Sequence, residues 1–259
     1  MFEKWPQTDD EKEMRKNNRE FLTDRLRKRF DFSRSDQSRM VPEPPFQKPY
    51  DKENAVIIEL PGKKDWSDVC DISLADAISS RKSRRSFKDQ ELSIEELSFL
   101  LYATQGIRET GRHCFRTVPS AGARHSFETY LSIGNVDGME NGLCRYLPED
   151  HSLLQIHTDE NITLKTASAS FNQMFIADSS VVFIWTTIPY RMEWRYGPAA
   201  HRVIAFDIGH ICQNLYLACE GIGGGTCGIG AYDQERIDDL IGVDGEEEFA
   251  IYLAPVGKV

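Results

Sequence analysis

The sequence predicts an α+β protein in which helices and strands mix without strict β-α-β alternation. Two patterns indicate this class. Serine caps precede apolar residues at helical spacing, and short apolar runs alternate or cluster as they do in strands. The 259 residues contain no internal repeat or low-complexity tract. A chain of this length accommodates one core, or one core with an appendage.

The first fifty residues differ in composition from the rest. Residues 9–30 are dense in charge, and their sparse apolar members predict a surface helix with a narrow apolar stripe. These members are Met14, Phe21, Leu22, Leu26 and Phe30. Four prolines within residues 42–49 then predict an extended linker. We therefore expect an N-terminal helical arm with a Pro-rich linker over residues 1–50 and a second domain over residues 51–259.

The first elements of this domain are indicated by their ends. Residues 55–60 predict a short strand that stops at a Pro-Gly pair. Ser73 with Asp76 predicts the start of a short helix. Ser93 with Glu96 forms a capping box before helically spaced leucines, and Gly106 predicts the end of that helix.

Later elements follow from apolar periodicity. Residues 127–133 alternate between apolar and polar, which predicts a half-buried strand, and residues 143–147 predict its hairpin partner. The remaining patterns predict two helices and two strands. The helices cover residues 164–176 and 207–220, and the strands cover residues 181–187 and 249–254.

Composition and charge limit the class of protein. The net charge is −10, from 31 basic and 41 acidic residues, which argues against a general nucleic-acid binder. The basic cluster within residues 25–29 could meet nucleic acid or an anionic membrane, but in an acidic chain a solvated helix face is favoured. The N-terminus lacks a secretory signal pattern, and the longest apolar run, residues 181–188, is too short to span a bilayer.

The cysteines indicate a reducing compartment. All six are scattered, without a C-x-x-C pair or histidines at zinc-ligand spacing, which predicts free thiols and no metal site. Cytoplasmic location is therefore the expectation, without nucleic-acid or membrane partners.

The first segment that indicates chemistry is the basic loop of residues 81–87. Residues 81–86 hold four cations and two hydroxyls, a set that can surround a phosphate. Arg81, Lys82, Ser83 and Arg85 are the candidate ligands. Taken alone, the same loop would more often be a solvated basic turn.

A second segment, residues 119–125, leads into the strand that begins near residue 127. Pro119, Ser120, Ala121 and Gly122 are small or conformationally special, and they would let the backbone approach a flat ring closely. The alternative is an ordinary loop entering a strand.

Two further segments lie on and after the helix over residues 207–220. His210 and Gln213 share a face opposite the apolar one, which an ordinary solvated helix would also show. Residues 221–230 contain six glycines and include the spacing G-x-G-x-x-G. A dinucleotide-binding loop is rejected, because the stretch follows a helix rather than a strand. It instead predicts a turn with exposed backbone N–H groups.

Taken in order, these segments resemble the nitroreductase superfamily, and most closely its SagB-type branch, which includes azoline oxidases. The resemblance covers about residues 73–258. It is carried by Arg81-x-Ser83-x-Arg85-x-Phe87, by Pro119-Ser-Ala-Gly122, by the Asp207-Ile-Gly-His210 helix, by the glycine-rich turn and by Pro255-Val-Gly-Lys258. Each motif is weak alone, but their common order is specific.

The resemblance implies a nitroreductase-like fold, with a central, mainly antiparallel sheet flanked by helices, and FMN bound at a homodimer interface. It implies that the basic loop holds the phosphate and ribityl chain, and that Lys258 completes that site. Residues 119–122 would border the ring from the partner chain. Amides near Gly223 and Gly224 would face flavin N5, with Gln213 also at the cofactor.

The resemblance also shows a departure. Azoline oxidases carry a Lys-Tyr pair for acid–base chemistry, and the matching place here reads Arg195-Tyr196. Arginine cannot act as a general base, whereas tyrosine can exchange a proton. The candidate catalytic residues are therefore Tyr196, Arg195, His201 and His210. This substitution puts azoline oxidation in doubt without affecting flavin chemistry.

The functional expectation is an FMN-dependent oxidoreductase that transfers hydride through flavin N5. Two enzyme activities fit this expectation: an NAD(P)H-dependent reductase of nitro or quinone compounds, and a SagB-like dehydrogenase that acts on a peptide or a small heterocycle. The alternative from another class is a protein that holds flavin or binds a partner without turnover. Bleaching of the flavin by NADPH without oxygen would separate these interpretations.

Overall fold

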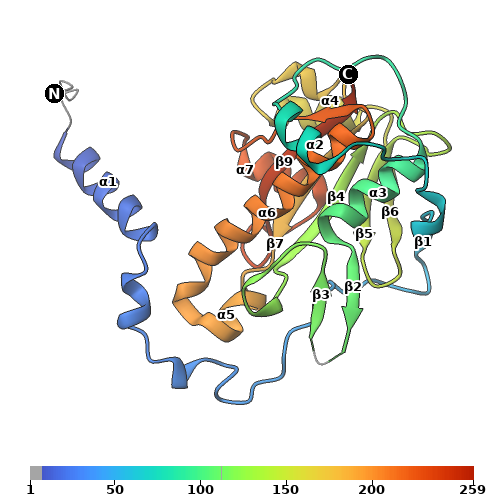
Figure 1. Cartoon of the computed structure of the whole chain (residues 1–259). Helices are drawn as coiled ribbons and strands as arrows, with labels where there is room; N and C mark the ends of the chain where they lie inside the picture. Colours follow the sequence, from blue (N-terminus) through green and yellow to red (C-terminus); the bar gives the residue numbers. More distant parts are fainter. Residues whose placement is uncertain (1–7, 112) are drawn as a thin grey trace.

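The protein, described here from a computed structural model over residues 8–111 and 113–259, is built around one seven-stranded antiparallel sheet (Figure 1). The strand order is β1-β6-β5-β4-β7-β9-β8. The strands are β1 (Val56–Glu59), β4 (Phe127–Ile133), β5 (Gly142–Leu147), β6 (Ser152–Thr158), β7 (Val181–Thr187), β8 (Gly224–Thr226) and β9 (Phe249–Lys258). The α+β class and the antiparallel sheet are confirmed.

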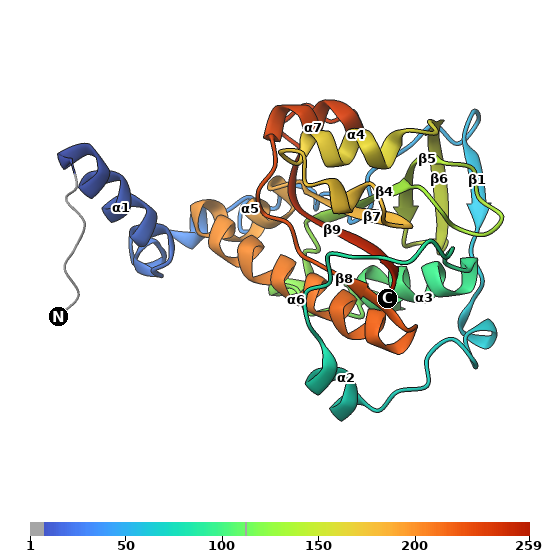
Figure 2. The ribbon, with the colours of Figure 1, turned by 90° about the horizontal axis from the view of Figure 1, so that it is seen from above.

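Helices cover both faces of the sheet, so the domain has three layers (Figure 2). α3 (Ile94–Gln105) and α6 (Ala200–Gly221) pack on one face, and α4 (Ile162–Ala169) and α7 (Gln234–Ile241) on the other. Consecutive residues of the central strand β7 alternate between the two cores. Because both faces are covered, all of β7 is buried.

Smaller elements flank these layers. α2 (Leu74–Ser80) and α5 (Tyr190–Tyr196) pack against α6, and a separate two-stranded ribbon consists of β2 (Ile107–Thr110) and β3 (Cys114–Arg116).

The predicted helix starts are confirmed by their caps. The Ser73 side chain accepts a hydrogen bond from the Asp76 N–H at the start of α2. Ser93 and Glu96 form the reciprocal capping box of α3, which ends at Gly106. These local signals are readable from sequence because both partners lie within one helical turn.

The prediction of a half-buried strand over residues 127–133 was wrong. Every residue of β4 is buried, because its polar face meets partners that the strand pattern does not reveal. The Glu128 carboxylate accepts a 2.6 Å hydrogen bond from Arg191, which is also buried. Tyr130 donates to Glu248, and Ser132 accepts from Thr166. The polar residues at alternate positions of β4 are therefore buried and hydrogen-bonded, and they do not face solvent.

Other boundaries differ from the prediction. The helix expected over residues 164–176 ends at Ala169, because Phe171 and Asn172 take left-handed backbone conformations. α6 begins seven residues before the predicted position 207, and β9 continues to Lys258. α5, α7, β2, β3 and β6 were not predicted as separate elements.

The N-terminal arm has two parts. α1 (Asp9–Phe21) starts at a Thr8 capping box and has no buried residue. It is shorter than the expected helix over residues 9–30, and a short 3-10 helix, Arg25–Lys28, follows it. Figure 1 shows this part extending away from the sheet.

Residues 35–49 instead run along the body, held by hydrogen bonds. The Gln37 N–H donates to the Trp194 carbonyl at 2.9 Å, and the Trp194 indole N–H donates to Val41 at 2.9 Å. Lys48 reaches Glu248 at 2.5 Å and, through its backbone N–H, Glu128 at 2.8 Å. The proline-rich linker is therefore an ordered segment that is bound to the surface of the domain.

All six cysteines are free thiols, and only Cys70 is not buried. No helix within residues 8–111 and 113–259 combines the length and apolar character needed to cross a membrane. Over the same residues, no cluster of three His, Cys, Asp or Glu side chains is arranged to hold a metal ion.

Candidate functional site

The basic loop and the glycine-rich stretch, 140 residues apart in sequence, lie in direct contact at the edge of the sheet. The Arg84 N–H donates to the Thr226 carbonyl at 2.9 Å, and Ser83 forms a parallel bridge with Thr226. A Cβ on Gly225 would lie 2.4 Å from Arg84 Cγ. Glycine is therefore required at position 225 for this approach. The predicted turn is in part the edge strand β8, paired with β9.

Tyr216, on α6, joins these segments through its hydroxyl. That oxygen accepts a hydrogen bond from the Gly228 N–H at 2.8 Å and shares one of 2.9 Å with the Ser83 hydroxyl. The Arg81 guanidinium lies 5.2 Å from the centre of the Tyr216 ring, at cation–π distance. One side chain of α6 thus fixes the basic loop relative to the glycine-rich turn.

The loop is strongly positive and locally uncompensated. Among the residues that the structure describes, none of its four cations forms an ion pair with a carboxylate. These cations are Arg81, Lys82, Arg84 and Arg85. The Nε of Arg84 is buried without a hydrogen-bond partner. Because a buried N–H of a cation is costly to leave unpaired, the arrangement suits an anionic ligand with several acceptor oxygens.

Lys258 and Gly223 border the same edge. The Lys258 ammonium is paired with the Glu96 carboxylate and donates to the Ile222 carbonyl at 2.8 Å. Direct contact with a phosphate would therefore require Lys258 to leave or share Glu96. Gly223 has a φ of 62°, and the space where a Cβ would stand is open. The backbone at Gly223 is accordingly accessible to a ligand.

The second predicted cofactor segment lies toward the other end of α6. Residues 121–123 form a single 3-10 turn, and the Ala121 N–H donates to the Asp207 carboxylate at 3.1 Å. Burial raises the pKa of Asp207, while hydrogen bonds from Ser120 and Ala121 act in the opposite direction. Asp207 thus fixes the small-residue loop to α6.

This loop has an unusual backbone. Gly122, Ala123 and His125 all have positive φ values, which only glycine adopts without cost. His125 is buried, and its Nε2 is 3.0 Å from the Cys114 carbonyl. Burial lowers the pKa of His125 to about 3, with the nearby Arg116 as the second cause, so the ring is neutral. The surrounding packing therefore holds the loop in one shape.

Arg195 and Tyr196 stand against this loop. A Cβ on Gly122 would lie 2.8 Å from the Tyr196 hydroxyl and 2.9 Å from the Arg195 side chain. The Arg195 guanidinium lies 5.6 Å from the centre of the Tyr196 ring. Both residues also line a cavity of about 480 Å³ whose other wall is the N-terminal arm. Gly122, Arg195 and Tyr196 thus form one cluster. In it, the small-residue loop of residues 119–122 lies against the predicted Arg195-Tyr196 pair.

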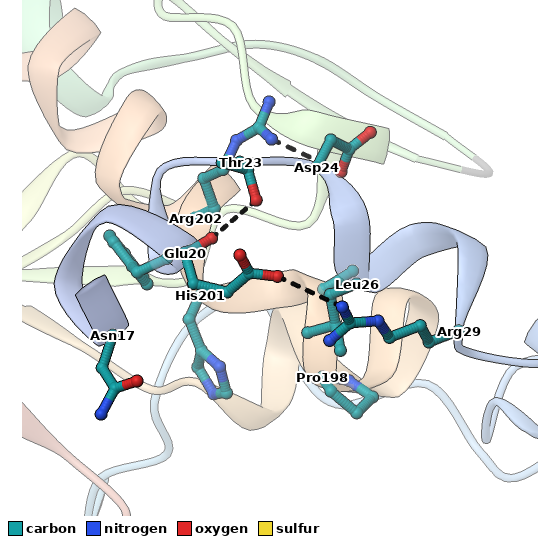
Figure 3. Close-up of a pocket in the computed structure, with 11 residues that line it drawn as sticks. Asn17, Glu20, Thr23, Asp24, Leu26, Arg29, Pro198, His201 and Arg202 are labelled. Carbon is teal, nitrogen blue, oxygen red and sulfur yellow. Dashed lines mark hydrogen bonds and ion pairs between the residues drawn. The ribbon is translucent and has the colours of Figure 1, made fainter. Parts of the chain in front are cut away.

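The two candidate histidines do not join that cluster as a pair. His201 and His210 are nine residues apart on α6, which is about 13 Å along a helix and half a turn in phase. The His201 Nε2 lies 2.7 Å from the Glu193 carboxylate. Figure 3 shows His201 and Arg202 in a pocket between α6 and the arm, where Arg202 contacts Asp24. His210 and Gln213 are exposed on α6.

Two residues of this arrangement were not singled out from the sequence. Tyr216 and Asp207 lie within a helix whose pattern was interpreted as an apolar face and a solvated face. An acid among the apolar residues of a helix face, as Asp207 is beside Ile208 and Ile211, is a signal that could have indicated a buried partner. Tyr216 carried no such signal, because its partners come from distant segments.

Comparison with known proteins identifies relatives over most of the chain. The model of the "Nitroreductase family" matches residues 78–258. The nitroreductase-like protein MJ1384 of Methanocaldococcus jannaschii is 35% identical over 191 residues, covering 74% of this chain and 93% of that protein. The trifolitoxin-processing protein TfxB of Rhizobium leguminosarum is 34% identical over 143 residues, 51% of this chain and 38% of TfxB.

Solved structures share the fold. A nitroreductase-like protein from Ralstonia eutropha matches with a TM-score of 0.65 at 22% identity, covering 85% of this chain and 95% of that one. A chain of the Escherichia coli microcin synthetase McbBCD complex, solved with truncated pro-MccB17, matches with a TM-score of 0.59 at 19% identity. That match covers 78% of each chain.

Proposed function

Because the chain belongs to the nitroreductase family, we propose that it is an oxidoreductase that uses FMN. We propose further that two copies of the chain together complete each FMN site. The observation that carries the proposal is the unpaired basic loop fixed against the glycine-rich turn. Four cations, the orphaned Arg84 Nε and the open backbone at Gly223 lie at one sheet edge. This combination fits a phosphate followed by a flat ring.

The residues fit a mononucleotide. Arg81, Lys82, Ser83 and Arg85 would hold the phosphate and ribityl chain, and the backbone at Gly223 and Gly224 would face the ring. The described residues supply one such cationic loop, and every strand pair of their seven-stranded sheet is antiparallel, so the described part of the chain has no parallel β-α-β unit for an adenylate, which favours FMN over FAD. Lys258, tied to Glu96, would act on the phosphate mainly through its charge.

The placement of the second half-site supports a homodimer. Ala121 contacts α6 at Asp207, whereas Ser83 contacts it at Tyr216, nine residues and about 13 Å further along the axis. In a two-fold pair of antiparallel α6 helices, the residue 119–122 loop of one chain would approach the basic loop of the other. Each copy then contributes one half of each of two sites.

α6 has a face suited to such pairing. Ala205, Gly209 and Gln213 follow one another at four-residue spacing on its exposed side, with Phe206 beside them 47% exposed. Nothing lies within 4 Å of the place where a Cβ on Gly209 would stand. Small residues at this spacing let two helices approach closely, and an exposed phenylalanine adds apolar area.

When bound, FMN would supply the hydride and electron transfer chemistry, as cofactors do in such enzymes. The protein's own contribution is orientation and charge. The basic loop holds the anionic end, and the small-residue loop leaves room for a ring. Tyr196 is the member of the Arg195-Tyr196 pair able to exchange a proton with substrate, while Arg195 stabilises an anion.

The relatives guide the choice of substrate class. TfxB is named for trifolitoxin processing, and the McbBCD structure contains truncated pro-MccB17. These two names support a peptide-derived substrate, and the name of MJ1384 supports a nitro compound as the alternative. The Arg195-Tyr196 pair favours a dehydrogenation other than azoline oxidation, since arginine does not accept the proton. NAD(P)H remains the candidate electron donor for an activity as a reductase.

The first experiment is a visible spectrum of the purified protein, with the cofactor released by heat and identified by chromatography. We expect a yellow protein that releases FMN and sediments as a dimer. Colourless protein that does not take up added FMN would refute the proposal. FMN bound without reduction by NADPH or turnover of any peptide substrate would instead support the flavin-holding alternative.

A further inference from the structure

We propose that a separate aromatic pocket, near the C-terminal end of α3, binds an organic cation such as the ammonium or guanidinium group of a basic side chain. The pocket measures about 400 Å³ and is bounded by residues 62–66, by β2 and by the turn between β5 and β6. It shares no lining residue with the proposed FMN half-sites. The proposal is independent of the proposed function.

Aromatic rings form the wall of the pocket. The Trp66 ring centre lies 5.1 Å from that of Tyr102 and 5.7 Å from that of His151. The Tyr102 and His151 rings are 6.0 Å apart and nearly perpendicular. Rings at such angles present both faces and edges to one space, and ring faces attract cations.

Hydrogen bonds fix the Trp66 and His151 rings of the wall. His151 Nδ1 is 2.7 Å from the Tyr146 hydroxyl, and His151 Nε2 is 2.8 Å from the Ser98 hydroxyl. The Trp66 indole N–H donates to Ser98 at 3.3 Å. Burial lowers the pKa of His151, so at neutral pH the ring adds no positive charge that would repel a cation.

The pocket already holds a cation of its own chain. Lys63 and Tyr102 both line it, and the Lys63 ammonium lies 4.6 Å from the centre of the Tyr102 ring. This is within the usual range of a cation–π contact. Lys63 is exposed, on the short 3-10 turn Lys63–Asp65, so it can swing away without unfolding the pocket. We interpret it as a stand-in for a ligand cation.

Acidic side chains lie at the rim of the pocket. Glu109, Glu149 and Asp150 line the pocket, and none of the three carboxylates is in an ion pair within the described part of the chain. Among the described residues of the lining, the only other cation is Arg108, whose Nε donates to the Arg116 carbonyl at 3.0 Å. Once Lys63 is displaced, the lining carries more negative than positive charge.

A specific consequence is that Lys63 competes with the ligand. Calorimetric titration in an amine-free buffer can use the blocked tripeptide acetyl-Gly-Lys-Gly-amide, with norleucine in place of lysine as the uncharged probe. We expect the lysine peptide to bind at least fivefold more tightly. Lys63→Met should increase its affinity about two- to fivefold, the range of one exposed cation–π contact.

Two variants keep the test specific. Lys64→Met removes an adjacent exposed lysine that does not line the pocket, and it should leave the affinity unchanged. Tyr102→Leu should weaken binding about two- to fivefold, with its thermal midpoint measured as a check on folding. Equal binding of the norleucine peptide, or a Lys63→Met affinity that stays the same or falls, would overturn the proposal.

The source of the cation is separated by a third probe, methylammonium chloride. Binding of the lysine peptide ten times more tightly than methylammonium assigns the pocket to a peptide, and equal affinities assign it to a small amine. FMN content is measured on the same samples. A protein that binds no FMN but follows the Lys63 and Lys64 pattern would refute the proposed function and leave the pocket standing.

Discussion

The two ends of α6 differ in how they are held, and this difference is the basis of our proposal that each site is shared between two chains. At the Tyr216 end, three segments are joined by direct hydrogen bonds and an edge-strand pairing. At the Asp207 end, one loop with left-handed residues is held by a buried acid and faces Arg195 and Tyr196. The first end carries several unpaired cations, whereas the second consists of small residues in a fixed backbone conformation.

This contrast implies a division of roles. Under the proposed function, the cationic end would supply binding energy for an anionic group, whereas the small-residue end would supply shape and a proton-exchanging hydroxyl. Because about 13 Å of helix separates Asp207 from Tyr216, neither end alone would surround the proposed cofactor. Variants at each end, and between them, should therefore give distinguishable losses.

The largest loss should come from Gly209→Arg, which places bulk and charge on the exposed face between the two ends. We expect monomers by sedimentation and FMN affinity lowered about 100-fold or more, because the contacts from the partner's loop are lost together. Gly209→Ala is the matched control, since alanine favours the helix and stays small. A Gly209→Arg monomer that binds FMN tightly would show that one chain holds the complete site.

The next largest loss should come from Arg81→Ala and Arg85→Ala at the cationic end. Each should weaken FMN binding by about 1.5–3 kcal/mol, the value of a charge-assisted hydrogen bond. Lys88→Ala is the control, because Lys88 lies just beyond the loop and donates to the Val259 carbonyl. If both arginine variants titrate with FMN as the parent does, the loop is only a solvated basic turn.

At the other end, Tyr196→Phe should separate turnover from binding. We expect FMN affinity to stay the same and turnover of the peptide-derived substrate to fall about 100-fold, since proton transfer loses its donor. Reduction by NADPH should change little. Full activity of the phenylalanine variant would make Tyr196 a packing residue, and the proton-transfer role would pass to His201 or His210.

The smallest effect should come from Tyr216→Phe, which removes the hydroxyl between Ser83 and Gly228. Both hydrogen bonds of that hydroxyl are lost, but neither is made to FMN, so we expect FMN to bind only about 0.5–1.5 kcal/mol more weakly, with the dimer intact. Ser83→Ala should give a loss of similar size. The double variant should lose less than the sum, because both changes remove the same bond. Strict additivity would argue that the two hydroxyls act separately.

Local signals in the sequence predicted much of the fold. The caps at Ser73 and Ser93, the hairpin of β4 and β5 and the buried strand β7 each depend on residues within a short segment. Their partners are fixed by helical or strand geometry, so periodicity and capping chemistry suffice. The helices α5 and α7 were not predicted, because each is short and its apolar face is set by packing on neighbouring elements.

By itself, the sequence determined the family and the antiparallel α+β class, and it indicated the candidate segments for the chemistry, since these are encoded in residue type and order. Only the tertiary structure decided that β4 is buried on both faces, that Lys258 is paired with Glu96, and that Tyr216 joins the basic loop to the glycine-rich turn. It also placed His201 and His210 apart. Such contacts join residues far apart in the chain, and their cost or gain depends on burial and on partners that no local pattern contains.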